Sequence, residues 1–354
     1  MSFITLNDYI NNKITIADNN KLTIKNIYNL YENIKRPHDI ILVLNNVGNN
    51  IPYNFANYKL INLIKNLDQT IHTNIFIFNG DICMPPIKTN IMLIWSNKNN
   101  YHPHLPINDN TYIHIPYTET LQIEQMNIPF DSKLDYNVYD YITSNVTIYC
   151  NNLYKNHPNI NFVPIGVQIH SKASVGARFE HIQFDLNEIK NTYTINDKNI
   201  LCYFNCTIGN KSTEFVNFQY GNIRELCYEN LKDKPFIFWE SYDSINGNNE
   251  LEKFKNYYRR LCQSKFCICP PNFVPDSYRI WDCIYMGCIP IVLKYYSNNY
   301  TDNLPIYFID NYTDFIELTE DKLNTIWFNM INKTYNYSKL DINYFEQLII
   351  SNNK

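Results

Sequence analysis

The stretch Phe266-Cys-Ile-Cys-Pro-Pro-Asn-Phe-Val-Pro-Asp-Ser-Tyr-Arg-Ile-Trp-Asp-Cys-Ile-Tyr-Met-Gly-Cys-Ile-Pro-Ile-Val-Leu293 contains the pattern that decides the fold. Its first residues form a short apolar run and its last five form another, which is typical of buried strands. Between them we expect a helix that begins near Asp276 and Ser277 and ends at Gly287, because Asp and Ser favour helix starts and glycine favours helix ends. A strand, a helix and a second buried strand in this order indicate a parallel α/β sheet.

The same alternation of strand-like and helix-like segments continues along the chain. Apolar runs predict strands at 40–44, 74–81, 91–95, 112–115, 146–149, 200–204, 235–239 and 306–309. Apolar residues at helical spacing predict helices at 58–67, 214–231 and 250–265, and a long helical tail from residue 314. Such alternation is typical of a mostly parallel sheet covered by helices, so the predicted fold class is α/β.

The chain length indicates two such domains. At 354 residues it exceeds a typical domain of roughly 100–200 residues. We expect an N-terminal α/β domain at 1–170, a polar connection at 171–197, a second α/β domain at 198–325, and a helical tail at 326–354 that packs back on the first domain. Two Rossmann-like domains joined in this way face each other across a cleft, and ligands in such proteins bind at the carboxyl ends of strands.

Charge and composition indicate which classes of partner the protein has and in which compartment it lies. With a net charge of -4 and no run of basic residues, the sequence offers no indication of nucleic-acid binding. We find neither a secretory signal nor a membrane-spanning stretch of ~20 apolar residues, so we expect a cytoplasmic protein. The codons for Asn, Ile and Tyr, which are abundant here, are rich in A and T. They indicate an AT-rich genome such as that of a protist or a giant virus, and a viral protein would lie in the host cytoplasm or the virion.

Metal-binding and dinucleotide-binding motifs are weak or incomplete. Cys267-x-Cys269 has no second cysteine pair or spaced histidine pair to complete a zinc site, and core thiols in a reducing compartment are the alternative. His102-Pro-His104 has no nearby carboxylate pair. No Gly-x-Gly-x-x-Gly and no Asp-x-Asp occur, and Gly209-Asn-Lys-Ser-Thr213 lacks the first glycine of a P-loop. We therefore predict no metal site and no cofactor.

Three polar residues recur at helical spacing on one side of the helix in the opening stretch. Two interpretations fit Asp276, a helix cap or a contact with a ligand. Arg279 lies in the first turn, where a cation opposes the helix dipole unless an anion such as a pyrophosphate compensates it. The alternative for Arg279 is an ion pair with Asp276 or Asp282. Asp282 comes one turn later, and its carboxylate can accept hydrogen bonds from ribose hydroxyls.

This segment resembles the exostosin-type glycosyltransferases, which have the two-domain GT-B fold. The family pattern is Ser-Lys-Phe, an apolar strand, Pro, a loop, Asp-Ser/Thr-x-Arg, an aromatic residue, Glu, and Gly-Cys-x-Pro before an apolar strand. The matching residues are Ser264-Lys-Phe266, Pro270, Asp276-Ser-Tyr-Arg279, Trp281, Asp282 and Gly287-Cys-Ile-Pro-Ile-Val292. Asp282 stands where the family usually has Glu, and the loop at 271–275 lacks the glycine often seen there. The resemblance covers about residues 199 to 295.

The resemblance implies a GT-B-like glycosyltransferase that needs no metal. It would move a sugar from a nucleotide-sugar donor, with a UDP-sugar favoured, to a hydroxyl of a glycan or glycoprotein acceptor, with inversion. The second domain would bind the donor through Arg279, Asp282, Asp276, Ser277, Lys211, Arg224 and Asn205.

The first domain would supply the general base of this reaction. Asp81, at the predicted end of a strand, is the first candidate, and His104 and Glu119 follow. The alternative for Asp81 is a turn residue after Gly80. A second functional class also fits the sequence, namely a glycan- or nucleotide-binding protein that kept this fold and lost catalysis.

Overall fold

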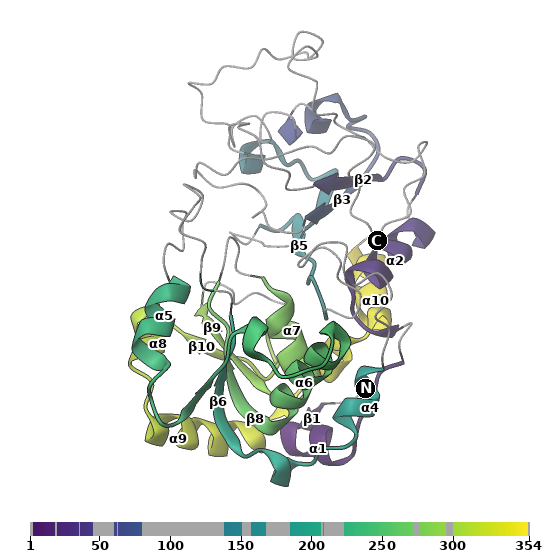
Figure 1. Ribbon diagram of the computed structural model, residues 1–354. Helices are drawn as coiled ribbons and strands as arrows, with labels where there is room; N and C mark the ends of the chain where they lie inside the picture. Colours follow the sequence, from purple (N-terminus) through teal and green to yellow (C-terminus); the bar gives the residue numbers. More distant parts are fainter. Residues whose placement is uncertain are drawn as a thin grey trace. The chain divides into compact units, whose positions relative to one another are not determined.

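The computed structural model (Figure 1) describes most of the second half of the chain and parts of the first. The described residues are 3–17, 20–34, 36–44, 60–61, 63–79, 138–150, 157–167, 185–206, 208, 223–271, 276–294 and 300–352. The chain divides into two compact units. The larger comprises Met1–Ile27, Ile165–Val216 and Tyr220–Lys354, and the smaller comprises Tyr28–Pro164 and Asn217–Gln219.

The larger unit is built on a parallel sheet. Its strands are β6 (Ile200–Phe204), β7 (Ile237–Trp239), β8 (Ser264–Ile268), β9 (Ile289–Leu293) and β10 (Tyr307–Ile309). They lie in the order β10-β9-β8-β6-β7, and every neighbouring pair is parallel. The strands predicted in this half of the chain are therefore confirmed. The apolar runs of β8 and β9 are buried almost throughout, whereas the edge strands β7 and β10 are partly exposed.

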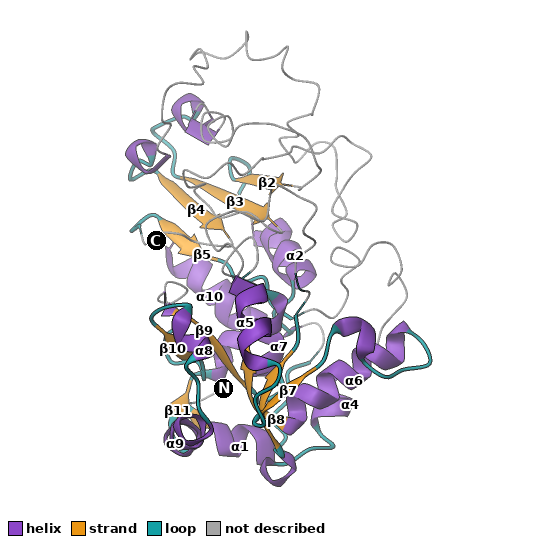
Figure 2. Ribbon diagram, turned by 60° about the vertical axis from the view of Figure 1, so that its left-hand side comes forward, coloured by secondary structure: helices purple, strands orange, loops and turns teal. Residues whose placement is uncertain are grey.

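Helices cover both faces of this sheet, as Figures 1 and 2 show. On one side α6 (Glu250–Gln263) and α7 (Tyr278–Tyr285) contact each other and the strands. On the other side α5 (Ile223–Leu231) contacts α8 (Thr313–Ile316), and α9 (Glu320–Ile331) contacts β6. The arrangement is the predicted α/β fold, with one hydrophobic face of each helix against the sheet.

The helix in the opening stretch of sequence is one of the best buried elements. Ile280, Trp281 and Ile284 of α7 are at most 1% exposed, as expected for the side that packs on the sheet. Gly287 ends the helix with a φ of +70°, a left-handed conformation that favours glycine. A Cβ atom there would lie 2.6 Å from Cγ1 of Ile10, so the close approach also requires glycine.

The first residues of the chain belong to this larger unit. Strand β1 (Ile4–Thr5) pairs with β11 (Thr334–Tyr335), and α1 (Leu6–Asn11) contacts α9. The Tyr9 ring stacks on Tyr337 with the ring centroids 3.8 Å apart, and the Tyr9 hydroxyl donates to the carbonyl of Tyr285. The division into units thus differs from the predicted N-terminal domain at 1–170. Local sequence patterns could not reveal this difference, because these contacts join distant parts of the sequence.

The described part of the predicted connection at 171–197 contains short helices. Residues 185–197 contain α4 (Leu186–Lys190) and a short helix, η6 (Ile195–Asp197). Leu186 and Ile189 are buried at helical spacing, so this segment is packed rather than a polar linker.

Lys190, the last residue of α4, is also buried. Its ammonium group lies 3.5 Å from the centroid of the Tyr9 ring and donates to the backbone carbonyl of Ile14. Burial lowers the pKa of Lys190 to about 7, and the nearby charges of Lys21 and Lys198 act in the same direction.

The predicted helical tail from residue 314 is largely helical but is not one continuous helix. The chain instead forms α8, α9, β11, a short helix η10 (Tyr337–Leu340), and α10 (Ile342–Asn352). Two side chains cap new helix starts: Thr319 accepts a hydrogen bond from the backbone of Lys322, and Asn336 accepts one from Ser338. Such caps interrupt a helical pattern because they satisfy backbone N–H groups that a continuous helix would use.

The smaller unit contains a second parallel sheet. Its strands lie in the order β2 (Ile40–Leu44), β3 (Thr73–Asn79), β4 (Val146–Cys150) and β5 (Ile160–Phe162), drawn together in Figure 2. Helix α2 (Ile24–Ile34) and a short helix, η4 (Val138–Tyr141), accompany them. The predicted strands at 40–44, 74–81 and 146–149 are confirmed where the structure describes them. The predicted strands at 91–95 and 112–115 lie outside the described residues.

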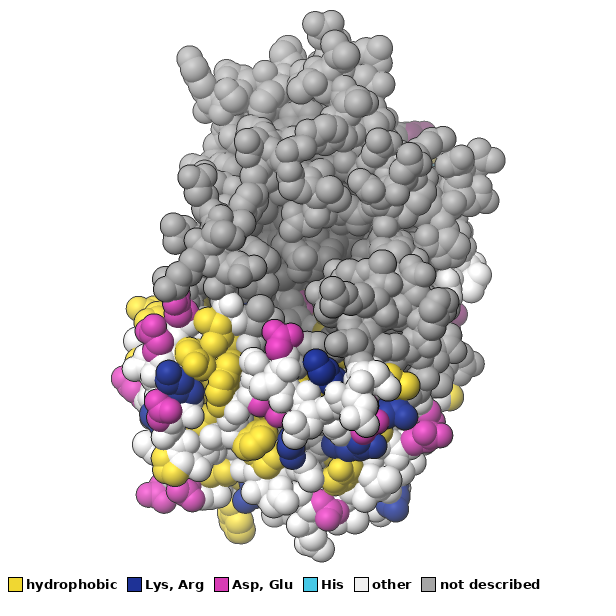
Figure 3. All heavy atoms as spheres, in the orientation of Figure 1, with side chains coloured by type: hydrophobic (Ala, Val, Ile, Leu, Met, Phe, Trp, Pro, Cys, Tyr) yellow, Lys and Arg dark blue, Asp and Glu magenta, His cyan; other side chains and the backbone are white. Residues whose placement is uncertain are grey.

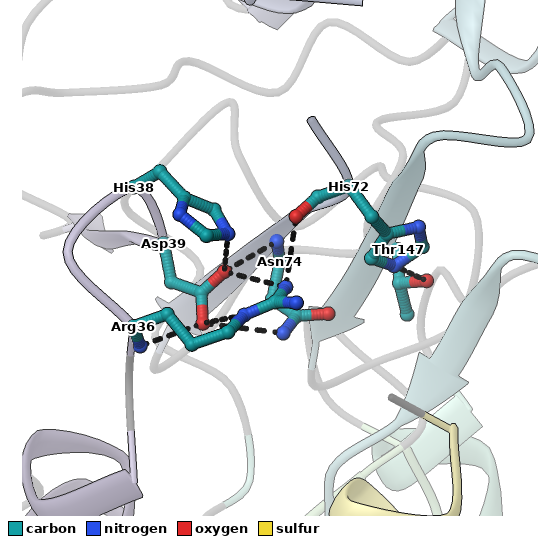
Figure 4. A network of polar contacts seen from close by, with 6 residues as sticks. All are labelled: Arg36, His38, Asp39, His72, Asn74 and Thr147. Carbon is teal, nitrogen blue, oxygen red and sulfur yellow. Dashed lines mark hydrogen bonds and ion pairs between the residues drawn. The ribbon is translucent and has the colours of Figure 1, made fainter. Parts of the chain in front are cut away.

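A polar network holds the starts of these strands together (Figure 4). Arg36 donates to both carboxylate oxygens of Asp39, the residue before β2, and to the carbonyl of His72, the residue before β3. Asp39 also accepts from the backbone and the side chain of Asn74, and His72 lies 3.1 Å from the Thr147 hydroxyl. Burial raises the pKa of Asp39, but these hydrogen bonds outweigh it and the pKa is lowered. The network lies at the amino ends of the strands, opposite the carboxyl ends at which α/β sheets generally bind ligands.

Side chains of different kinds are mixed on the surface that Figure 3 shows. Among the described residues, hydrophobic side chains form several small groups with acidic and basic side chains between them. In the same part of the chain, no helix combines the length and the apolar character that crossing a bilayer requires.

Candidate functional site

The topology of the larger sheet marks one place as a ligand site. The chain passes from β6 to β7 at one edge, returns to β8 on the other side of β6, and then continues to β9 and β10. The strand order therefore reverses between β6 and β8. In open α/β sheets, ligands bind outside the carboxyl ends of the strands at this reversal.

Asn205 and Arg279 meet at this place. Asn205 directly follows β6, and Arg279 lies in the first turn of α7, the helix that follows β8. Nη2 of Arg279 donates to Oδ1 of Asn205 at 3.4 Å. The Nε atom of Arg279 is buried, and no residue of the described part of the chain accepts a hydrogen bond from it. A buried donor without an acceptor is uncommon in folded proteins and fits a group that awaits a ligand.

A second arginine lies close to the same strand end. Arg224 is in the first turn of α5, the helix that follows β6. Burial raises the pKa of the Cys206 thiol, whereas the positive charges of Arg279 and Arg224 both act to lower it. Two helix starts, each with an arginine in its first turn, give this edge of the sheet a positive potential that suits an anion.

Asp282 is placed differently from the ribose contact that the sequence predicts. The residue is 0% exposed. Its Oδ2 accepts from the Tyr257 hydroxyl at 3.3 Å and its Oδ1 from the Tyr258 hydroxyl at 3.2 Å, both from α6. The carboxylate therefore fastens α7 to α6, and a ribose could reach it only if those tyrosines moved. The sequence could not show this, because the tyrosines lie 24 and 25 residues earlier.

Asp276 is not the helix cap. Ser277 occupies the N-cap position of α7, with no side-chain capping hydrogen bond. The carboxylate of Asp276, which is 2% exposed, accepts from Nε1 of Trp281 at 2.7 Å and from the backbone N–H of Ile165 at 2.8 Å. The two hydrogen bonds tie the start of α7 to a distant segment of the same unit. No ion pair between Asp276 and Arg279, which is the alternative interpretation of Arg279, is present in the described part of the chain.

A group of residues beside Asn205 was missed by the sequence reasoning. Glu240 directly follows β7, and its Oε1 accepts from the Tyr203 hydroxyl at 2.9 Å. The same oxygen lies 3.5 Å from Nε of Arg260. The amide of Asn205 donates to the Glu240 carbonyl at 2.8 Å. The available signal was the position of Glu240 immediately after a predicted strand.

Three thiols form the possible metal-binding group of the described residues. The sulfur atoms of Cys267, Cys269 and Cys283 all lie within 4.8 Å of one another, and all three residues are buried. Cys267 and Cys269 come from β8 and its end, and Cys283 from α7. Cys283 supplies a third thiol that the sequence pattern did not place beside Cys267 and Cys269, so the cluster fits a metal site as well as the core thiols that the sequence suggests.

The remaining predicted site residues cannot be placed. The candidate bases Asp81, His104 and Glu119 and the candidate donor-binding residue Lys211 lie outside the described residues.

Comparison with known proteins identifies the family of the chain. The model of the exostosin GT47 domain matches residues 110–315, more than half of the 354 residues. Two Arabidopsis thaliana proteins, both named probable glycosyltransferases, are similar over shorter segments. One is 32% identical over 96 residues, which are 27% of this chain and 19% of the relative. The other is 35% identical over 57 residues, which are 16% of this chain and 11% of the relative.

The matches to the two relatives thus span a fifth or less of their length, and the family match is much longer. The family match includes α7, β6, β7 and β8, which together form the edge described above. The chain belongs to the exostosin GT47 family of glycosyltransferase domains.

Proposed function

We propose that this protein transfers a sugar from a nucleotide-sugar donor, with a UDP-sugar favoured, to a hydroxyl of a glycan or glycoprotein. The observation that carries the proposal is the position of Arg279, whose buried Nε has no acceptor among the described residues, at the reversal of strand order between β6 and β8. A guanidinium binds a diphosphate through two parallel hydrogen bonds, and the start of α7 adds the positive end of the helix dipole.

The same groups suit the chemistry of sugar transfer. As the bond between the anomeric carbon and the diphosphate breaks, negative charge grows on the leaving phosphate. Arg279, Arg224 and the starts of α5 and α7 would stabilise that charge. In our proposal they perform the role that a divalent metal performs elsewhere, so that transfer needs no metal. Ser277 and Lys211 are proposed as additional donor contacts.

The proposal also covers the acceptor and the general base. We place the acceptor and the general base in the first half of the chain, in a GT-B arrangement of two Rossmann-like domains. Asp81, followed by His104 and Glu119, is proposed to take the proton from the acceptor hydroxyl, which then attacks the anomeric carbon with inversion. The family match spans residues 110–315. It therefore covers most of the half of the chain that we propose to bind the donor, and the last part of the half that we propose to bind the acceptor.

Calorimetric titration with UDP, GDP and dTDP tests the donor site. We expect one of them to bind, and the variant Arg279→Ala to bind it roughly 10- to 100-fold more weakly, because a charge-assisted contact is lost. Arg259→Ala is the matched control. Arg259 is an arginine of the neighbouring helix α6 whose exposed side chain pairs with Glu252 at 2.6 Å.

Release of nucleoside diphosphate from UDP-, GDP- and dTDP-sugars then tests catalysis, with and without EDTA. We expect the release to persist in EDTA and to be reduced in Arg279→Ala. Asp81→Asn should abolish the release while donor binding is kept. If no nucleoside diphosphate binds the wild-type protein, the proposal is wrong. Binding without release from any donor would instead support a binding protein that has lost catalysis.

A further inference from the structure

We infer that Glu240 forms the ribose-binding part of the donor site, accepting hydrogen bonds from the ribose hydroxyls of a nucleoside diphosphate. The inference rests on the proposed function and assigns to Glu240 the role that the sequence pattern predicts for Asp282. It follows from the position, the partners and the charge of Glu240.

The backbone holds Glu240 at the edge of the site. Its N–H donates to the carbonyl of Phe204 at 3.3 Å, and its own carbonyl accepts from the Asn205 side chain. Asn205 in turn accepts from Arg279. A single asparagine therefore links Glu240 to the proposed diphosphate clamp, and a nucleotide bound by Arg279 would have its ribose within reach of this edge.

One oxygen of the Glu240 carboxylate has partners in the described structure, and the other can accept a hydrogen bond from a ligand. Its side chain is 11% exposed, unlike that of the fully buried Asp282. Within the described residues, the Tyr203 hydrogen bond and the Arg260 ion pair both involve Oε1, so Oε2 can accept from a ligand. Burial raises the pKa of Tyr203, and the neighbouring Glu240 raises it further.

Topology gives an independent reason. In α/β folds that bind dinucleotides, an acidic residue at the end of the second strand, beside the first, accepts from the ribose hydroxyls, and the phosphates lie at the helix after the first strand. In the parallel sheet of this unit β6 is the first strand, β7 the second, and the two are neighbours. Glu240 stands at the end of β7, and Arg224 lies in the helix that follows β6.

The competing explanation is that Glu240 only balances the charge of Arg260. Both explanations predict that loss of the carboxylate perturbs the protein, so stability alone cannot separate them. Discrimination between a ribose and a deoxyribose can, because only a ribose contact depends on the 2′-hydroxyl.

The experiment measures the dissociation constants of UDP and 2′-deoxy-UDP, or of the corresponding pair for whichever nucleoside diphosphate binds. We expect the wild-type protein to bind the ribonucleotide roughly tenfold or more tightly than the deoxy form. In Glu240→Gln that preference should fall to about twofold or less, with the affinity for the deoxy form nearly unchanged. Glu252→Gln, an exposed glutamate of the same unit, should keep the wild-type preference.

Several outcomes would overturn the inference. Equal affinity of the wild-type protein for the two nucleotides would do so, as would an unchanged preference in Glu240→Gln or a lost preference in Asp282→Asn alone. If Glu240→Gln does not fold, Glu240→Asp shortens the side chain, keeps its charge, and should still reduce the preference. A wild-type protein that binds no nucleoside diphosphate refutes the proposed function as well. Weakened binding in Arg279→Ala, together with a wild-type preference for the ribonucleotide in Glu240→Gln, refutes this inference alone.

Discussion

Replacing Lys190 with methionine should stabilise the protein at neutral pH and change how its stability depends on pH. The Lys190 ammonium is enclosed by α4, the Tyr9 ring and the backbone of Ile14, and its pKa is about 7 instead of 10.5. At about 1.36 kcal/mol per pH unit, this difference corresponds to roughly 5 kcal/mol that folding loses when the amine must be buried in its charged form. Methionine has a similar shape and carries no charge.

The sign of the effect follows from proton binding. Below pH 7 the amine is charged in both the folded and the unfolded chain, so the full penalty applies. Between about pH 7 and 10.5 the unfolded chain keeps the proton and the folded chain releases it, so the wild-type protein becomes more stable as pH rises. Lys190→Met loses the contact with Tyr9 and the hydrogen bond to Ile14, together worth about 1–3 kcal/mol, so its net gain at pH 6 should be about 2–4 kcal/mol.

Urea unfolding, followed by circular dichroism at pH 6, 7, 8 and 9, measures this directly. The free energy of unfolding of the wild-type protein should rise relative to that of Lys190→Met by about 1 kcal/mol per pH unit above pH 7.5. Lys322→Met, which removes an exposed lysine of α9, should run parallel to the wild-type curve. Parallel curves for the wild type and Lys190→Met would refute the reasoning, because they would show that Lys190 keeps its proton when the chain folds.

Two further substitutions test the fold itself. Gly287→Ala should lower the free energy of unfolding by more than about 1 kcal/mol, measured by the same urea titration, because φ is +70° and the new Cβ would lie 2.6 Å from Ile10; a stability equal to that of the wild type would contradict the close approach. Asp39→Asn should cost about 2–4 kcal/mol at pH 7, because a buried carboxylate that accepts from Arg36 and Asn74 is replaced, and the difference from the wild type should shrink as pH falls through the lowered pKa of Asp39. A difference that stays constant down to pH 2 would show that the charge of Asp39 is unimportant.

The sequence was sufficient for the strands and for the helix of the opening stretch. Runs such as Ile289–Leu293 are apolar throughout, and only a buried parallel strand or a buried helix tolerates that, so the flanking glycine and the short length decide between them. The sequence also pointed to Arg279 as a candidate anion ligand, since a cation in the first turn of a helix is unfavourable unless something compensates it.

The partners of the carboxylates could not be predicted in the same way. Asp282 follows the spacing of a ligand-facing side, yet two tyrosines from α6 occupy its oxygens. Asp276 has the sequence position of a helix cap, yet it accepts from Ile165, which is 111 residues away. Hydrogen bonds between distant segments leave no periodic trace in the sequence, and the choice among several possible partners depends on tertiary packing.

The pairing of β1 with β11 has a consequence for how the protein is made. The larger unit is discontinuous in sequence, because residues 28–164 of the smaller unit are inserted between two of its parts. During synthesis the ribosome completes the smaller unit long before β11 and Tyr337 emerge, so Ile4 and Tyr9 must remain without their final partners until nearly the whole chain exists. A shortened protein designed from the family match alone would omit this N-terminal segment and expose the apolar surface that Tyr9 and Ile10 cover, so expression of the donor-binding unit by itself requires the first residues to be joined to it.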